Sequence, residues 1–137
     1  MLIINKYILN LISFFLIIYP FALLSGPFFS DGIVSVVSIL FIFLLIYNKD
    51  YNFVTNYYNL FFLFIFIYLI FSSLISTNVI LSLESSLFYS RHWIFCLSFA
   101  YVIMYNKKIF SFFLLSTIFM IVFLLLDSFI QYYTGLN

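Results

Sequence analysis

Arg91 is the side chain in this sequence best suited to hold a charged ligand, and it is the lone arginine. Its planar guanidinium presents a fork of donors that matches phosphate and diphosphate oxygens, whereas a lysine offers only a point charge. Glu84 precedes it by seven residues. On a helix the two side chains would therefore point the same way, about 10 Å apart along the axis. Two interpretations follow: an ion pair that holds a helix in place, or a binding site for a phosphate-bearing headgroup.

A second polar pair lies near the end of the sequence. Asp127 and Gln131 are four residues apart, so on a helix they share one face. A carboxylate at the centre of a bilayer costs roughly 2.5–3.5 kcal/mol, and Asp127 avoids much of this by following an apolar run instead of interrupting it. The pair is either an ordinary polar helix end or part of a substrate-binding site with Arg91 and Glu84.

The other reactive residue types lack partners in the sequence. His92 is the only histidine and Cys96 the only cysteine, and no Ser–His–Asp, Cys–His or metal-ligand spacing is present. We therefore predict no catalytic residue, no bound metal and no cofactor in this chain. His92 is interpreted as a contact to lipid headgroups, and Cys96 as a packing or lipid-facing side chain.

The elements that carry these residues are apolar runs separated by charged residues. Hydrophobic residues make up 67% of the chain and charged residues 7%, which leaves too little polar surface for a soluble fold. Each run is close to the ~20 residues that an α-helix needs to cross a ~30 Å hydrocarbon core. We predict an all-α, multi-spanning transmembrane helical bundle that forms a single domain, with spans at about 7–24, 33–47, 57–75, 90–105 and 109–126.

The segment from Thr77 to His92 has a different pattern. Laid out at 3.6 residues per turn, its serines and Asn78 fall on one face and its aliphatic residues on another. This amphipathic pattern predicts a short helix that lies in the membrane interface and runs into the fourth span.

The distribution of basic residues predicts the orientation. Lys6, Lys49, Lys107 and Lys108 would all lie on one side of a five-span protein, and Arg91 on the other. The excess of lysine marks the cytoplasmic side, so we expect a cytoplasmic N-terminus. The net charge of +1 provides no basic field for a nucleic acid partner.

Several stretches resemble the N-terminal part of bacterial O-antigen ligase family membrane proteins, and the related O-antigen polymerases are similar in outline. The stretches are, in order, YPFALLSGPFFSDGIVSVVSILF, SSLFYSRHWIF, YNKK and DSFIQYYTGLN. The most specific are P-F-x-L-L-S-G-P-F, which begins at Pro20, and D-x-x-x-Q-Y-x-T-G, which begins at Asp127. Arg91 falls in the second stretch, and Asp127, Gln131, Tyr132 and Gly135 fall in the last.

The resemblance implies metal-independent glycosyl transfer at the outer face of the bacterial plasma membrane. A ligase of this family moves a polysaccharide from an undecaprenyl diphosphate carrier onto lipid A–core, in lipopolysaccharide biosynthesis. The expected partners are therefore membrane lipids, the lipid-linked glycan donor and the lipid A–core acceptor. Such proteins have roughly a dozen helices, and their catalytic residues lie in the later half. We thus expect residues 1–137 to be the N-terminal part of a longer polytopic protein and to be inactive alone.

Three alternatives remain open at the level of sequence. An O-antigen polymerase would share the outline of the ligase. A small non-enzymatic membrane subunit would need no further spans. A transporter fragment would favour broken helices and ionisable groups at mid-bilayer, and of these features only Pro20 is present.

Overall fold

The structure, a computed structural model, describes residues 2–135 and the side chains of all of these except residues 2–4, 57 and 58. In this range the chain forms six helices and no strand. They are α1 (Leu2–Leu24), α2 (Pro27–Asn48), α3 (Tyr51–Val54), α4 (Tyr57–Leu74), α5 (Val79–Tyr105) and α6 (Lys108–Thr134). The predicted all-α membrane bundle is therefore confirmed.

Four of the described helices, α1, α2, α5 and α6, are long and apolar enough to cross a membrane. The third predicted span, 57–75, corresponds to α4, which is apolar but has only 18 residues. At ~1.5 Å per residue such a helix is roughly 27 Å long, slightly short of a ~30 Å hydrocarbon core. The expected five spans thus correspond to four long helices and one shorter one.

The predicted interfacial helix before the fourth span is not a separate element. Residues 79–105 form one continuous helix, α5, which contains no glycine or proline that would interrupt it. Its serines also remain compatible with a helix, because Ser85, Ser86 and Ser90 donate their hydroxyl protons to carbonyls three or four residues earlier. The polar stretch that suggested an interface is therefore the first half of a long helix.

The helices also extend beyond the apolar runs at other points. Pro27 is the first residue of α2, a position that suits its fixed φ, so Asp31 lies inside this helix and not in a loop. At the other end of the chain, α6 continues past residue 126 to Thr134. Gly135 then ends it at φ 65°, with its N–H donating to the carbonyl of Gln131.

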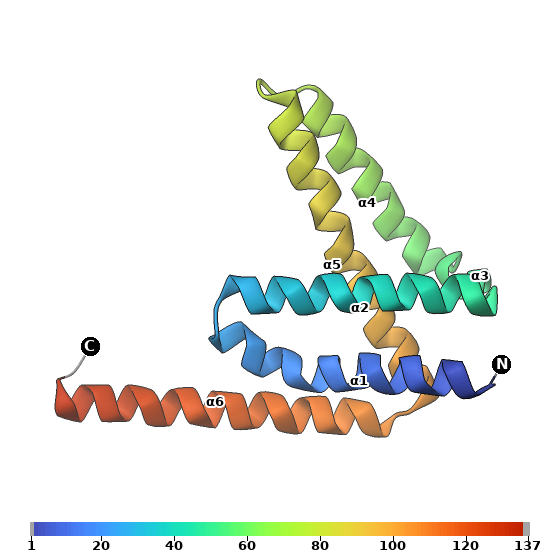
Figure 1. The fold of residues 1–137 in the computed structure, drawn as a ribbon. Coiled ribbons are helices and arrows are strands. Elements are labelled where there is room, and N and C mark those ends of the chain that lie inside the picture. The colour runs from blue at the N-terminus through green and yellow to red at the C-terminus, as the bar shows by residue number, and fades with distance from the viewer. Residues whose placement is uncertain (1, 136–137) are drawn as a thin grey trace.

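Two groups of helices make up the molecule. The helices α1, α2 and α6 lie side by side with their axes roughly parallel, and α1 is in the middle (Figure 1). The hairpin of α4 and α5 crosses this group obliquely, with α5 packed on α2 and the α4–α5 turn projecting away (Figure 1). The ends of α2 and α5 and the starts of α1 and α6 lie at the same end of the bundle (Figure 1).

The core lies where α5 crosses α1 and α2. It contains Ile12 and Leu16 of α1, Val37, Phe41 and Leu44 of α2, Leu97, Tyr101 and Val102 of α5, and Ile109 of α6. The ring of Tyr101 packs edge-on against Phe41 and Phe53, with centroids 5.4 and 5.1 Å away. This aromatic cluster fixes the short helix α3 against the bundle.

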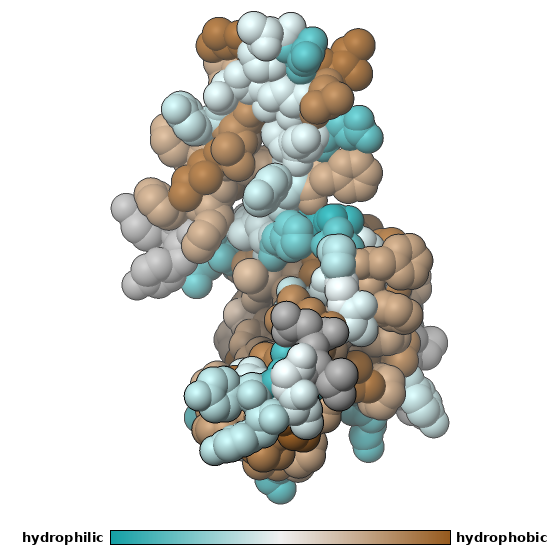
Figure 2. Space-filling view, turned by 90° about the vertical axis from the view of Figure 1, so that its left-hand side faces the viewer, coloured by the Kyte–Doolittle hydropathy of each residue, from teal (hydrophilic) through white to brown (hydrophobic). Residues whose placement is uncertain are grey.

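Serine hydroxyls join helices that otherwise meet through apolar side chains. Ser116 of α6 donates to the carbonyl of Ile17 in α1 at 2.6 Å, and Ser38 of α2 donates to the carbonyl of Arg91 in α5 at 2.9 Å. Small residues allow close approach of membrane helices, and hydroxyls there add hydrogen bonds between them. Apolar side chains cover much of the visible outer surface (Figure 2), as expected of helices that face lipid.

Candidate functional site

Arg91 lies in the middle of α5 and faces the first turns of α2. Its Nη2 donates to the Asp31 carboxylate at 2.9 Å, and its Nη1 lies 3.4 Å from the hydroxyl of Ser35. The backbone carbonyl of the same residue accepts the hydroxyl proton of Ser38. Asp31, Ser35 and Ser38 thus hold both the side chain and the backbone of Arg91 from one helix face.

The partner of Arg91 is Asp31, so the interpretation in which Glu84 forms an ion pair with Arg91 is wrong. Glu84 is exposed on α5 and makes no ion pair with any described residue. Seven residues separate Glu84 and Arg91 along one helix, which is too far for a salt bridge. Asp31 comes from another helix and reaches the guanidinium across the α2–α5 contact.

The sequence contains a signal for this arrangement. Asp31, Ser35 and Ser38 are spaced i, i+4 and i+7, so they form a single polar stripe along α2. The residues between them are almost all apolar. Such a stripe predicts a polar partner on a neighbouring helix, although it does not identify the partner.

The guanidinium is incompletely satisfied by these contacts. A guanidinium has five N–H donors, and only Nη2 has a short bond. Its Nε is covered and has no acceptor among the described residues, while the guanidinium carbon lies 5.4 Å from the centre of the Phe88 ring. About a quarter of the side chain (26%) is exposed, and Asp31 is half-exposed at 48%. The group is therefore anchored but still accessible.

Arg91 is one of the residues that line a groove of about 350 Å³ between α2 and α5. Its polar lining comes from Arg91 and from serines of α2 and α5, and the rest is apolar. The apolar lining residues are Ile39, Ile42, Leu87, Phe88 and Ile94. Such a groove is chemically complementary to an amphiphilic anion. The anionic group would bind the arginine, and the hydrocarbon chain would lie against the apolar side chains of the two helices.

Asp127 and Gln131 form a second polar group that is separate from Arg91. Gln131 Nε2 donates to Asp127 Oδ2 at 2.9 Å, so the predicted shared face on one helix is confirmed. Both side chains are exposed near the end of α6, and no contact in the described part of the chain joins them to Arg91. The structure therefore keeps apart two groups that the sequence suggested as one site.

His92 and Cys96 line a different hollow, between α4 and α5. It has a volume of about 440 Å³ and is mostly apolar, and the indole N–H of Trp93 beside it is covered without an acceptor among the described residues. The imidazole of His92 lies 5.9 Å from the Tyr89 ring, between centroids. Within residues 2–135, no cluster of histidine, cysteine and acidic residues could hold a metal ion.

Comparison of the chain with families of known proteins, with curated proteins and with solved structures finds no match. Any functional assignment therefore depends on the sequence motifs and on the geometry around Arg91.

Proposed function

We propose that this chain is the N-terminal membrane portion of an O-antigen ligase-like protein. Such a protein transfers a polysaccharide from an undecaprenyl diphosphate carrier to lipid A–core. The ordered motifs around Pro20, Arg91 and Asp127 support the choice of family. A multi-pass bundle of apolar helices is the architecture that this function requires.

The observation that carries the proposal is that the Arg91 guanidinium lines a largely apolar groove between α2 and α5. A polyprenyl diphosphate combines a doubly charged headgroup with a long hydrocarbon chain, and both parts have a complementary surface here. Arginine binds phosphate oxygens bidentately, and the guanidinium retains donors that its short bond to Asp31 does not use. Asp31 would then orient the guanidinium rather than neutralise it fully.

The test is glycan transfer in cells by the protein produced from its complete gene, at matched membrane abundance. We expect Arg91→Lys to reduce transfer at least roughly tenfold, because lysine keeps the charge but lacks the planar fork. Asp31→Asn should reduce transfer less, since asparagine can still accept one hydrogen bond from Arg91. Ligation onto lipid A–core separates a ligase from a polymerase, which would instead lengthen the lipid-linked glycan.

The competing interpretation is that Arg91 only joins α2 to α5 and has no contact with substrate. In that case Arg91→Lys would retain normal transfer, while Arg91→Ala would lower only the amount of protein in the membrane. That pair of results would contradict the proposed site. Glu84→Gln is the matched control on the same helix, because Glu84 is exposed and has no ion-pair partner among the described residues.

A further inference from the structure

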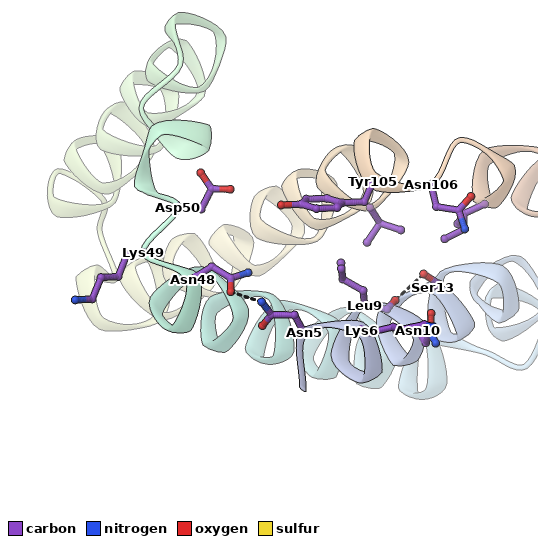
Figure 3. Close-up of a pocket in the computed structure, with 12 residues that line it drawn as sticks. Asn5, Lys6, Leu9, Asn10, Ser13, Asn48, Lys49, Asp50, Tyr105 and Asn106 are labelled. Atoms are coloured by element: carbon purple, nitrogen blue, oxygen red, sulfur yellow. Dashed lines mark hydrogen bonds between the residues drawn. The ribbon is translucent and has the colours of Figure 1, made fainter. Parts of the chain in front are cut away.

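A large hollow lies at the end of the bundle that carries the lysines, away from Arg91. It has a volume of about 820 Å³ (Figure 3). Three parts of the chain converge on it: the start of α1, the α2–α3 junction, and the α5–α6 junction. Its polar lining includes Lys6, Asn10, Asn48, Lys49 and Asn106, and we refer to this hollow as the lysine basin.

The charge of the lysine basin is positive. Lys6 and Lys49 line it, and Asp50 is its only acidic lining residue. The Asp50 carboxylate accepts a hydrogen bond from the Tyr101 hydroxyl at 3.3 Å, which holds it toward α5. Lys49 ends α2 in a left-handed conformation, with φ 54°, and its side chain extends outward at the rim (Figure 3). The flexible four-carbon stem of Lys49 would have to turn inward to bring this ammonium group to a ligand in the basin.

The neutral lining residues supply further hydrogen-bond donors. Asn48 accepts a hydrogen bond from Asn5 (Figure 3), and its amide group also donates to the Tyr101 hydroxyl, which leaves one amide N–H of Asn48 as a donor. Asn106 is placed similarly, because its side-chain oxygen accepts the backbone N–H of Lys108. Amide and ammonium donors together suit phosphate oxygens, and lysine is a common phosphate ligand in proteins.

The inner wall of the basin is apolar. Leu9, Val102 and Ile109 line it beneath the polar rim. A free phosphate would gain nothing from this wall, whereas the first carbons of an acyl chain would be removed from water against it. Basic pockets between membrane helices at one face of the bilayer bind anionic lipid headgroups in this way.

We propose that the lysine basin binds the phosphate group of an anionic phospholipid, with the start of its acyl chains against the apolar wall. The inference does not depend on the proposed function, because no residue of the basin belongs to the groove at Arg91.

The experiment is native mass spectrometry of the full chain purified in detergent, with phosphatidylglycerol, diacylglycerol or soluble glycerol 3-phosphate added. We expect the protein to retain one phosphatidylglycerol and no diacylglycerol, and to bind glycerol 3-phosphate much more weakly. The double variant Lys6→Gln/Lys49→Gln should lower retention of phosphatidylglycerol at least roughly tenfold. Asn10→Leu, which keeps every charge, should lower it by a smaller factor.

The matched control is Lys107→Gln/Lys108→Gln, which removes the same charge from the same end of the bundle without touching the lining of the basin. We expect it to retain phosphatidylglycerol within about twofold of the original chain. An equal loss in both double variants would overturn the proposal, because general surface charge would then explain the binding. Equal affinity for glycerol 3-phosphate and phosphatidylglycerol would overturn the assignment to a lipid.

Discussion

Among single residues, Arg91 makes the most polar contacts between helices in the described part of the chain. Its side chain bonds Asp31 and lies near Ser35, and its carbonyl accepts from Ser38. An unpaired charge within a membrane bundle destabilises the folded protein. Removal of either Arg91 or Asp31 would leave the other charge unpaired. Arg91 therefore matters for stability whether or not it also binds a substrate.

A double-mutant cycle measures this coupling. We expect Asp31→Ala and Arg91→Ala each to lower the thermal stability of the detergent-purified chain. The double variant should lose less than the sum of the two, with a coupling free energy of about 1–2 kcal/mol. Glu84→Ala serves as the control and should leave the melting temperature unchanged. Strict additivity of the two single changes would show that the 2.9 Å contact contributes nothing to the folded protein.

A second test concerns the contribution of the Tyr101 hydroxyl to the stability of the fold. It lies 3.3 Å from the Asp50 carboxylate and 3.2 Å from the Tyr105 hydroxyl, while its ring fills the core. Tyr101→Phe keeps the ring and removes these bonds together with the one from the Asn48 amide, so we expect a loss of about 0.5–1.5 kcal/mol in unfolding free energy. Tyr89→Phe, at an exposed tyrosine on the same helix, is the control. If Tyr101→Phe and Tyr89→Phe have the same melting temperature, the hydroxyl of Tyr101 does not stabilise the α2–α3 junction.

At the level of elements, α6 is the least buried of the four described helices that are long enough to cross a membrane. It lies along α1, and only Ile109 and Ser116 of its residues are buried. The hydrogen bond from Ser116 to the Ile17 carbonyl lies at this contact. The close approach of α1 and α6 thus depends on a small residue at position 116.

Ser116→Leu should therefore separate α6 from α1. We expect a loss of about 1–3 kcal/mol, the usual effect of forcing extra volume into a packed contact, and a smaller effect for Ser116→Ala. Ser128→Leu is the matched control, because Ser128 lies on the same helix, is exposed, and bonds only to the carbonyl of Leu124. Cysteine cross-linking between α1 and α6 would report the separation directly. Unchanged cross-linking in Ser116→Leu would contradict this account of the contact.

At the scale of the whole molecule, the arrangement constrains how the chain crosses the membrane. Asn48 and Lys49 at the end of α2 line the same basin as Asn106 and Ile109 at the start of α6. The chain must therefore cross the membrane an even number of times between these points. Since α5 is long enough to cross, the shorter helix α4 is expected to cross with it.

Reporter fusions test this topology. We expect fusions after Asp50 and after Lys108 to report the cytoplasm, because the lysines gather at that end of the bundle. A fusion after Asn78, in the α4–α5 turn, should report the outside. A cytoplasmic signal at Asn78 would show that α4 does not cross, and an inverted pattern would place Arg91 on the wrong side for the proposed chemistry.

The sequence alone determined the class of the protein and the approximate position of each long helix. A helix in lipid satisfies its own backbone, so an apolar run of sufficient length specifies it without reference to the rest of the chain. The sequence did not determine the ends of the helices, because hydropathy marks the end of an apolar run, and a helix can continue beyond it. Asp31 and Asp127, which lie just outside the predicted spans, accordingly lie within helices.

Only the tertiary structure decided which helices touch and which polar groups meet. Membrane helices that are apolar on every side carry little periodicity to mark a buried face, since lipid and protein interior are equally apolar. The pairing of Arg91 with Asp31, 60 residues away, depends on the crossing of α5 over α2. The lysine basin depends in the same way on three segments meeting at one end. Both features arise from packing between segments that are far apart in the sequence, and no local pattern specifies such packing.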